Sequence, residues 1–473
     1  MQKQHFTFPR IRNYNDSMEQ WKVCFKIIMN VEVFSMSNEV KKDVLDVEPY
    51  YPDVYKYGNI MTKHITWEGD PWYEVGQSYF ENSYIHAGLS GLEETFKGPD
   101  AAKLLSDCSI NNVYKWKSGK CKHLVALTPD GLVANHALFF KDAEESFRTT
   151  AGCSVPYLTA LQSGSYQCEY LTKKVFIFQF SGPLSLTILE KSTQTSLRDV
   201  KFLDFCPVSI PGIEAELEIC RIGMSGTLAY EVHGPAELGP AVYDHIYQIG
   251  KPMGMKRMGW KDYTVNHTFG GFAQMTVNFE TSLYQSPEFC ANAPFPMVCK
   301  GSVDPKDIRA RFRTPLECDW AWMAKLDHEF VGRETLENEI ANPKRKLVTL
   351  EFNTDDLADV YRSQFTDSPY KYMDMPCADP QPAGGHQDYV TDKDGNVIGI
   401  SADPTFSSHF HTMISHAILD VDQIEEGKEV LVQWGDYGKK IKNLRASIAR
   451  FPYIHGVMDN RDYDLSTVPS GIE

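Results

Sequence analysis

Tight-turn residues interrupt apolar runs at short intervals through the middle of this sequence. Residues 123–140, HLVALTPDGLVANHALFF, hold two apolar runs on either side of Pro129, Asp130 and Gly131, which is typical of a β-hairpin. Residues 173–191, KKVFIFQFSGPLSLTILEK, read as a strand, a Gly-Pro turn and a helix. Strands and helices that alternate at such short range predict an α+β body of interleaved hairpins and helices.

The same pattern continues along the chain. A helix is predicted directly after Asp100, which is placed to cap it. Residues 213–235 read as a strand, a loop and a second strand, and a helix is predicted over 238–251. The later part of the sequence is β-rich, with an Asp-Gly hairpin within 389–403. We therefore expect a small all-β domain after the α+β body.

The length of the chain predicts more than one domain. With 473 residues it exceeds what one ordinary core holds, and its 42% apolar residues supply enough material for two or three cores. Residues 1–70 are aromatic, charged and poorly periodic, which indicates a peripheral N-terminal extension. The polar segment 337–345 is the best boundary candidate. The expected division is therefore 1–70, then 71–340 as the α+β body, and 341–473 as the β domain.

Charge and targeting signals argue against several classes of partner. The 47 basic and 63 acidic residues leave a net charge of −16, so neither nucleic acid nor an anionic membrane is expected as the main partner. The first residues form no apolar leader, and no window approaches eighteen uncharged apolar residues. The eleven cysteines show no CxxC spacing and fit reduced, buried thiols. A cytoplasmic protein is the resulting expectation.

Three histidines offer a metal-binding alternative. His409 and His411 stand two residues apart, which on a strand places both rings on one face, and His416 follows shortly afterwards. No acid or cysteine stands close to them in sequence, so the ligand count is low. We expect no metal site.

Five segments, taken in order, resemble the folate-dependent aminomethyltransferase family, whose best-known member is the glycine-cleavage T-protein. Each motif is short, but their order and spacing over roughly residues 75–450 are those of the family. The tail is similar to that of the tetrahydrofolate-dependent aromatic O-demethylases, which act on vanillate or syringate. The segments are KGPDAAKLLSDCSINNV, KCKHLVALTPDGLVANHALFF, FQFSGPLSLTILEK, GMSGTLAYEVHGP and AKLDHEFVGRETLE, and those of the tail are KLVTLEFNTDDLADVY, DGNVIGIS and VQWGDYG.

The resemblance implies a three-lobed, folate-binding fold with a central channel and a C-terminal β-barrel. It also implies that Glu231 holds the pterin ring of tetrahydrofolate, because a carboxylate accepts hydrogen bonds from the amino-pyrimidinone edge. The alternative is an outward-facing glutamate on an alternating strand. Tyr230 then points to the opposite face and packs. Asn111 and Gln179 match family positions in the folate channel, and Phe272 matches an aromatic position near the donor ring.

Two residues are candidates for proton transfer to a leaving group. Tyr263 falls where the O-demethylases carry a catalytic tyrosine, and a proton delivered to a departing phenolate lowers the barrier. Asn135 and His136 replace an acid pair of the aminomethyltransferases. His136 can act as an acid near neutral pH, and Asn135 can contact the donor. Lys261 can meet a carboxylate of the folate or of the donor. The alternatives are a packed tyrosine, a buried structural histidine and a solvated lysine.

The resulting hypothesis is a tetrahydrofolate-dependent O-demethylase. It would move a methyl group from a methoxylated aromatic compound to N5 of tetrahydrofolate and leave a phenol. The donor could instead be a methylsulfonium such as dimethylsulfoniopropionate, a methylamine, or a methylenedioxy ring that gives methylene-tetrahydrofolate. A folate-binding protein without catalysis is the remaining alternative. The oligomeric state stays open.

Overall fold

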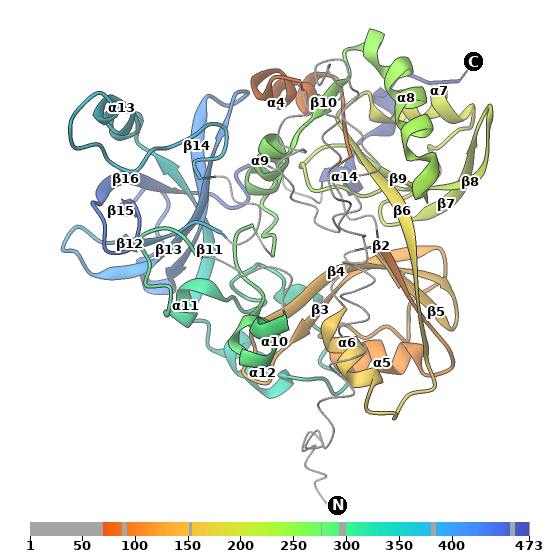
Figure 1. The fold of residues 1–473 in the computed structure, drawn as a ribbon, viewed down its shortest axis with the longest axis horizontal. Coiled ribbons are helices and arrows are strands. Elements are labelled where there is room, and N and C mark those ends of the chain that lie inside the picture. Colours follow the sequence, from red (N-terminus) through yellow and green to blue (C-terminus); the bar gives the residue numbers. More distant parts are fainter. Residues whose placement is uncertain are drawn as a thin grey trace, which may run out of the picture.

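The structure of the protein is a computed structural model that describes residues 70–87, 92–150, 154–275, 277–292, 299–379, 385–454 and 459–472. Apart from Asp70, the predicted N-terminal extension 1–70 lies outside these ranges. Figure 1 shows a β-barrel, a larger sheet with helices on its outer sides, and helix α9 between them. The three groups of elements surround the centre of the molecule.

Ten strands of the described chain form one sheet. The order β3-β4-β5-β2-β6-β9-β8-β7 is extended by β1, which pairs with β6, and by β10, which pairs with β1. The long strand β6 joins two halves, because its first part pairs with β2 and its second part with β9. The bounds are β1 Tyr84–His86, β2 Leu92–Lys97, β3 Lys120–Leu127, β4 Val133–Ala143, β5 Ser146–Thr149, β6 Glu169–Ser181, β7 Phe205–Ile210, β8 Ile213–Cys220, β9 Ala229–Pro235 and β10 Lys256–Met258.

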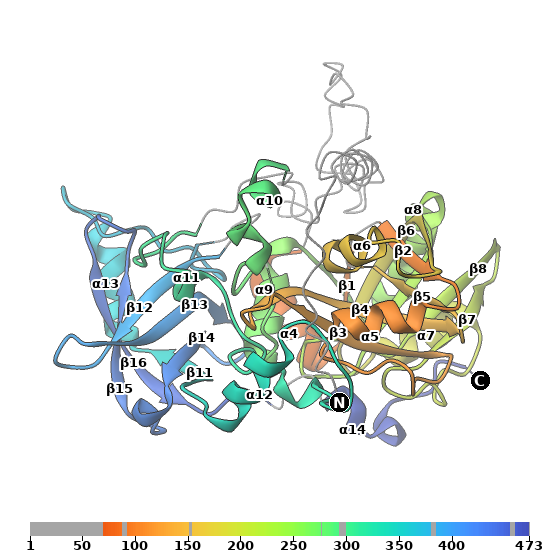
Figure 2. The same cartoon turned by 90° about the horizontal axis from the view of Figure 1, so that it is seen from below.

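Helices cover the outer face of each half of the sheet. α5 (Ala101–Cys108) and α6 (Val155–Leu161) pack on the half that contains β3 and β4, and their apolar residues share one core with it. α7 (Ser185–Thr193) and α8 (Gly239–Gly250) pack on the half that contains β6 and β9. The opposite faces of both halves turn toward α9 (Trp260–Gly270) and the barrel, as the turned view in Figure 2 shows.

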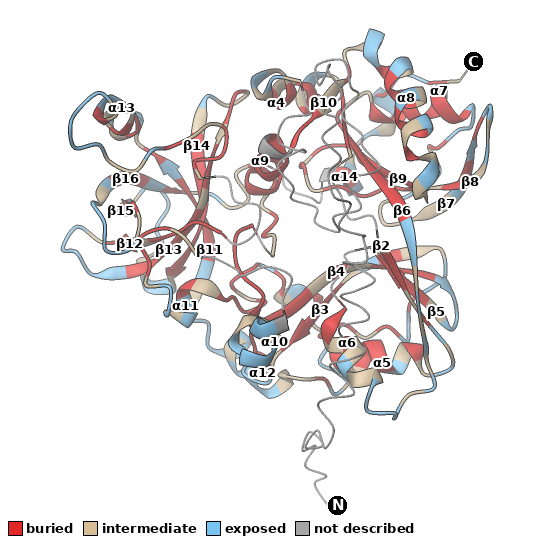
Figure 3. Cartoon of the chain, viewed as in Figure 1, coloured by how far each residue is buried: buried red, intermediate tan, exposed pale blue. Residues whose placement is uncertain are grey.

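The barrel closes in the order β11-β14-β13-β12-β15-β16, which leaves no free sheet edge. Its interior holds one apolar core around Trp434, and α13 (Thr354–Ser363) packs on its outside. Figure 3 shows the buried strands of the barrel and of the sheet facing α9. The bounds are β11 Arg345–Phe352, β12 Gln387–Thr391, β13 Val397–Ser407, β14 Thr412–Asp420, β15 Glu429–Trp434 and β16 Lys442–Ala449.

Shorter elements connect these bodies. Helix α4 (Trp72–Glu81) packs beside α9 and shares an apolar cluster with Tyr84 and Tyr263. No helix within the described ranges is both long enough and apolar enough to cross a bilayer. The remaining helices are α10 Pro287–Asn292, α11 Ile308–Arg311, α12 Arg333–Ala341 and α14 Asp459–Asp462, with 3-10 turns η2 Ala236–Leu238, η3 Lys251–Met253, η4 Ser282–Gln285, η5 Ala321–Met323, η6 Val421–Gln423 and η7 Leu465–Thr467.

The C-terminal tail leaves the barrel and packs on the half of the sheet that α7 and α8 cover. Arg198 donates hydrogen bonds to the carbonyls of Leu465, Val468 and Pro469, and the Val468 side chain enters the core beneath α7 and α8. Residues 459–472, which fall inside the predicted β domain 341–473, therefore contribute to the α+β body instead of the barrel.

The predicted local elements are confirmed. The hairpin around Pro129 to Gly131 is β3 and β4, the segment 173–191 is β6 followed by α7, and the Asp-Gly hairpin is β12 and β13. The predicted helix after Asp100 is α5, but the Asp100 carboxylate accepts a hydrogen bond from the Gln167 N–H and does not cap the helix.

Candidate folate and donor site

Strands β1, β6 and β9 present a polar face toward the centre of the molecule. Alternation along β6 and β9 sends the phenylalanines of β6 and Tyr230 into the core beneath α7 and α8, as predicted for Tyr230. The other face carries His86, Gln179 and Glu231, which lie side by side in adjacent strand registers. All three are buried, so polar groups that would ordinarily face water line the interior here.

A chain of polar side chains holds Glu231 in place. The His233 Nε2–H donates to Glu231 Oε2 at 3.0 Å, and His233 Nδ1 lies 4.0 Å from Glu218 Oε1. Glu218 is in turn paired with the buried Arg148 at 2.5 Å. His233 also packs edge-on against Phe140 at 5.4 Å. One carboxylate oxygen of Glu231 is thus fixed by the protein, which orients the group for a ligand.

Tyr84 connects Gln179 to α9. Its hydroxyl lies 3.3 Å from Gln179 Oε1 and 3.0 Å from Ser181 Oγ, and it accepts a hydrogen bond of 2.8 Å from the Asn266 side chain. Burial raises the pKa of Tyr84 well above its ordinary value, so the hydroxyl keeps its proton. The network fixes the Gln179 amide beside Glu231.

Tyr263 lies on α9 between two histidine rings. The His86 ring stacks on it at 4.7 Å with the planes 20° apart, and the His267 ring lies 4.5 Å away at a tilt. Burial raises the pKa of Tyr263 above its ordinary value, and the negative charge of Glu231 raises it further. The Tyr263 phenol is therefore a neutral hydroxyl at physiological pH, which can donate a proton but does not store a charge.

His86 and His267 are neutral, and their tautomers are fixed. A carbonyl oxygen only accepts, so His86 Nδ1–H donates to the Met258 carbonyl at 3.0 Å and His267 Nδ1–H donates to the Tyr263 carbonyl at 2.8 Å. Burial lowers the pKa of each ring to about 4. Each Nε2 is thus an acceptor, and neither has a hydrogen-bond partner among the described residues. Buried acceptors of this kind indicate a ligand that brings hydrogen-bond donors.

The β3–β4 hairpin contributes a different wall. His136 on β4 stacks on Trp320 at 4.3 Å and lies 5.4 Å from the Phe272 ring. Its Nε2 lies 3.0 Å from Nδ1 of His123, which lies on the neighbouring strand β3. No described Lys or Arg stacks on these rings or hydrogen-bonds to them. The wall is aromatic and uncharged.

Asn135 and His136 do not act as a pair, because successive residues of a strand point to opposite faces. His136 faces Phe272 and Trp320, whereas Asn135 is fully buried on the other side, next to Tyr157 in the core under α5 and α6. The expectation that Asn135 contacts the donor finds no support in this placement.

The expectation that His136 is an acid near neutral pH needs correction. Burial lowers the pKa of His136 well below its ordinary value, and the neighbouring His123 lowers it further. Burial also lowers the pKa of His123 to about 4. Both rings are therefore neutral at physiological pH.

Phe272 connects the two walls. It lies 6.1 Å from His267, which contacts Tyr263, and 5.5 Å from His123 in the hairpin. The structure therefore brings Glu231, Gln179 and Tyr263 together on one side, and Phe272 and His136 on the other.

Two further predicted site residues are placed differently. The Asn111 amide donates to the His123 carbonyl and accepts from the Val125 N–H, each at 3.0 Å. It therefore holds the backbone of β3 and has little capacity left for a ligand. Lys261 lies in the first turn of α9, but its side chain is outside the described part of the structure.

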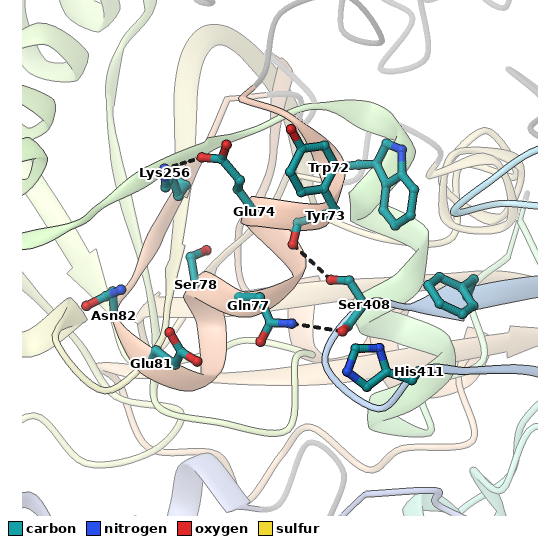
Figure 4. Close-up of a pocket in the computed structure, with 11 residues that line it drawn as sticks. Trp72, Tyr73, Glu74, Gln77, Ser78, Glu81, Asn82, Lys256, Ser408 and His411 are labelled. Carbon is teal, nitrogen blue, oxygen red and sulfur yellow. Dashed lines mark hydrogen bonds and ion pairs between the residues drawn. The ribbon is translucent and has the colours of Figure 1, made fainter.

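A surface cavity lies along the side of α4 that faces away from Tyr263. Figure 4 shows Glu74 paired with Lys256, and Gln77 and the Tyr73 carbonyl hydrogen-bonded to Ser408. None of the sequence-predicted site residues lines this cavity. The buried side of α4 separates it from Tyr263. We therefore place the chemistry on the polar face of the sheet.

No metal centre is found among the described residues. His416 Nε2–H donates to the Thr268 carbonyl at 2.9 Å, and His409 stacks on Phe80. His411 lies in the turn before β14 with φ of 54°. These rings serve packing and backbone contacts.

Sequence reasoning missed several residues of the site. His123 could have been found, because the hairpin register places it diagonally across from His136 on the same face. His233 could have been found by its spacing of two from Glu231. Tyr84, His86 and Trp320 carry no such local signal, because only the tertiary fold brings them to the site.

Comparison with known proteins identifies the class. Residues 89–267 match the GCVT N-terminal domain. The chain is 31% identical over 411 residues to a sesamin methylene transferase of Sinomonas sp. (strain No.22), covering 82% of this chain and 90% of that protein. It is 26% identical over 370 residues to a syringate O-demethylase of Sphingobium sp. (strain NBRC 103272 / SYK-6), covering 73% of this chain and 78% of that protein.

A solved structure shares the fold. Glycine cleavage system aminomethyltransferase T from Bartonella henselae aligns with a TM-score of 0.59 at 14% identity, covering 81% of this chain and 90% of that chain. The chain therefore belongs to the folate-dependent aminomethyltransferase, T-protein-like family. It is a one-carbon transferase whose family uses tetrahydrofolate.

The residues present fit tetrahydrofolate. The amino-pyrimidinone edge of a pterin presents adjacent N–H donors, and the orphaned acceptors of this face, His86 Nε2 and His267 Nε2, lie in the same interior as Glu231 and Gln179. A carboxylate whose other oxygen is already fixed by His233 is suited to such an edge. The N-terminal half of the fold thus supplies a cradle of acceptors for this cofactor.

Proposed function

We propose that the protein transfers a one-carbon unit from an aromatic ether oxygen to tetrahydrofolate and releases a phenol. The first candidate unit is the methyl group of a methoxylated aromatic compound. The observation that carries the proposal is the uncharged ring wall of Phe272, His136 and Trp320, which His267 links to a tyrosine held in its protonated form. A flat, apolar aromatic donor suits the wall, and a departing oxygen suits the tyrosine.

Glu231 and Gln179 would hold the pterin, with Glu231 oriented by His233. Bound tetrahydrofolate supplies a nitrogen nucleophile, N5, that accepts the carbon. The neutral His86 and His267 accept hydrogen bonds without adding charge near that nitrogen. The described residues around it thus leave the nucleophile uncharged.

Tyr263 would donate its proton to the departing oxygen. The bond between that oxygen and the transferred carbon breaks, the oxygen keeps the electron pair, and the Tyr263 proton completes the phenol. Burial raises the pKa of Tyr263, and the same desolvation would raise the pKa of the departing phenol, so the proton would pass between two buried phenols. The resulting tyrosinate is then reprotonated, because burial disfavours its charge.

The described rings of the wall favour an uncharged donor. A buried carboxylate needs a cationic or hydrogen-bonding partner, and the rings of the wall supply no charge. Among described residues, no Lys or Arg hydrogen-bonds to or stacks on Phe272 or Trp320. Lys261 remains a candidate donor contact on α9. An acidic donor such as vanillate or syringate would need Lys261 as the partner of its carboxylate.

A second candidate function is methylene transfer from a methylenedioxy ring. It is favoured by the similarity to a sesamin methylene transferase across 90% of that protein's length. The products would be a catechol and methylene-tetrahydrofolate, because two C–O bonds break and the two oxygens take up the protons that the folate nitrogens lose. Both candidates need the same wall and the same proton donor.

The test is incubation of the protein with tetrahydrofolate and four donors, followed by mass spectrometry of the folate product. The donors are an uncharged methoxyarene, an uncharged methylenedioxyarene, vanillate and a methylsulfonium. A methyl product from the methoxyarene supports the first candidate, and a methylene product supports the second. Turnover of the sulfonium alone would contradict the proposal, and folate binding without turnover of any donor would indicate a protein that lost catalysis.

A further inference from the structure

The two histidines of the hairpin form a hydrogen-bonded pair. His136 Nε2 and His123 Nδ1 lie 3.0 Å apart. The ring centroids are 4.9 Å apart with planes 13° from parallel. No described carboxylate pairs with either ring, so nothing in the described structure converts either of them into a stable imidazolium.

A pair of neutral imidazoles with one N···N hydrogen bond has two equivalent proton arrangements. In the first, His136 Nε2–H donates to His123 Nδ1, and His123 carries its own proton on Nε2. In the second, His123 Nδ1–H donates to His136 Nε2, and His136 carries its proton on Nδ1. Passage of one proton through the pair converts one arrangement into the other. Such a pair conducts a proton without storing one.

The position of the pair gives this property a direction. β3 is an edge strand of the sheet, and both His123 and His136 are half-buried. Asn111 fixes the His123 backbone through the carbonyl. His136 lies one strand further in, against Trp320 and Phe272. The pair therefore runs from the sheet edge to the ring wall.

We propose that His123 and His136 form a proton relay that supplies the donor side of the site, an inference that rests on the proposed function. A displacement at carbon places the nucleophile and the leaving oxygen on opposite sides of that carbon. The proton released by the nucleophile therefore cannot pass directly to the oxygen that needs one. A path from solvent on the donor side would supply the proton that the leaving oxygen needs.

The proton balance is as follows. His136 gives its Nδ1 proton to the tyrosinate or phenolate, His123 gives its Nδ1 proton to His136 Nε2, and His123 Nε2 takes a proton from water. One proton leaves water and one reaches the site, with no change in the charge of the pair. Between turnovers, once the products have left, His136 Nδ1 takes up a proton and His123 Nε2 loses one, which restores the second arrangement. His123 is thus a positioning residue that acts through His136.

The first experiment needs no turnover. Nitrogen NMR of the resting protein, with ¹⁵N-labelled histidine, is expected to show His123 and His136 neutral at pH 7, each ring with one protonated and one bare nitrogen. His123→Phe keeps an aromatic ring and removes the shared proton, so the His136 nitrogens should shift. Unchanged His136 signals in that variant would overturn the pairing, whatever the enzyme's donor is.

The second experiment measures turnover in H₂O and D₂O with the donor identified above. For His123→Phe we expect kcat to fall at least about tenfold, the KM for tetrahydrofolate to stay unchanged, and added imidazole to restore part of the rate. His409→Phe, outside the site, serves as the control. An unchanged kcat and isotope effect with no response to imidazole would overturn the relay. Absence of turnover in the unmodified protein would instead count against the proposed function, while the NMR result still decides the pairing.

Discussion

The two halves of the large sheet face the same interior with different chemistry. The half formed by β1, β6 and β9 offers Glu231, fixed by His233 and backed by the Arg148–Glu218 pair. The half formed by β3 and β4 offers the rings of His136 and His123, packed with Trp320 and Phe272 and paired with no described charge. One half is built around an oriented carboxylate, and the other around uncharged aromatic surface.

The difference matches the needs of two ligands. A pterin presents polar N–H groups and requires oriented acceptors, whereas an aromatic ether presents a flat apolar ring and requires surface contact. Tyr263 on α9 lies against the first half and reaches the second through His267 and Phe272. Folding both halves into one sheet fixes the distance between the two ligands, which group transfer requires.

Removal of the Tyr263 hydroxyl should give the largest effect. In Tyr263→Phe the leaving oxygen receives no proton, so we expect kcat to fall by about 10²- to 10⁴-fold while tetrahydrofolate affinity is retained. Tyr230→Phe is the matched control, because Tyr230 is buried on the opposite face of β9 in the core. Steady-state kinetics on both variants check this. Equal rates for the two would remove Tyr263 from the chemistry.

Neutralising the Glu231 carboxylate should weaken folate binding and leave donor binding unchanged, which would distinguish the roles of the two halves of the sheet. In Glu231→Gln the charge-assisted hydrogen bonds to the pterin weaken, and we expect the Kd for tetrahydrofolate to rise roughly ten- to a hundredfold, with little change in donor KM. Titration calorimetry measures the affinity. Glu237→Gln, an exposed position just beyond β9, should bind like the unmodified protein. A raised donor KM with unchanged folate affinity would reverse the assignment of the halves.

Acid should destabilise the fold through the neutral histidines. The pKa of His86 is about 4 in the folded protein and about 6.5 in an unfolded chain, so between these values only the unfolded chain binds the proton. The free energy of unfolding then falls as the pH falls, by about 1.4 kcal/mol per pH unit for each such group. Denaturant melts from pH 7 to 4 should show a shallower slope for His86→Phe. An identical slope would mean that His86 titrates normally.

Replacing the ring of Phe272 should give the smallest effect, confined to the donor. Phe272→Leu keeps most of the apolar volume but loses ring contacts with His123 and His136 worth about 0.5–1.5 kcal/mol. We expect the donor KM to rise a few-fold, with the Kd for tetrahydrofolate unchanged. Kinetics at varied donor concentration measure the change. A weaker folate affinity in this variant would place the pterin at the aromatic wall.

Much of the fold could be predicted because its signals are local. Turn residues at Pro129 to Gly131 and alternation along β6 and β9 identified the hairpins and separated Glu231 from Tyr230. Glu231, Gln179 and Tyr263 were predicted as site residues through resemblance to the family, and their proximity depends on strand register. That the ring of His136 is neutral at physiological pH was not predicted, because its pKa depends on burial and on His123, which no local pattern reports.

The sequence by itself determined the strands, helices and turns, the family, and the tetrahydrofolate cofactor, because these follow from short-range patterns and from motif order. Only the tertiary structure decided that Asn135 is turned into a core, that His86 and His267 are neutral acceptors around Tyr263, and that His123 shares a proton with His136. It also decided that residues 459–472 pack on the α+β body and not on the barrel. Protonation and orientation depend on which groups from distant segments exclude water from one another, and that is fixed only when the chain has folded.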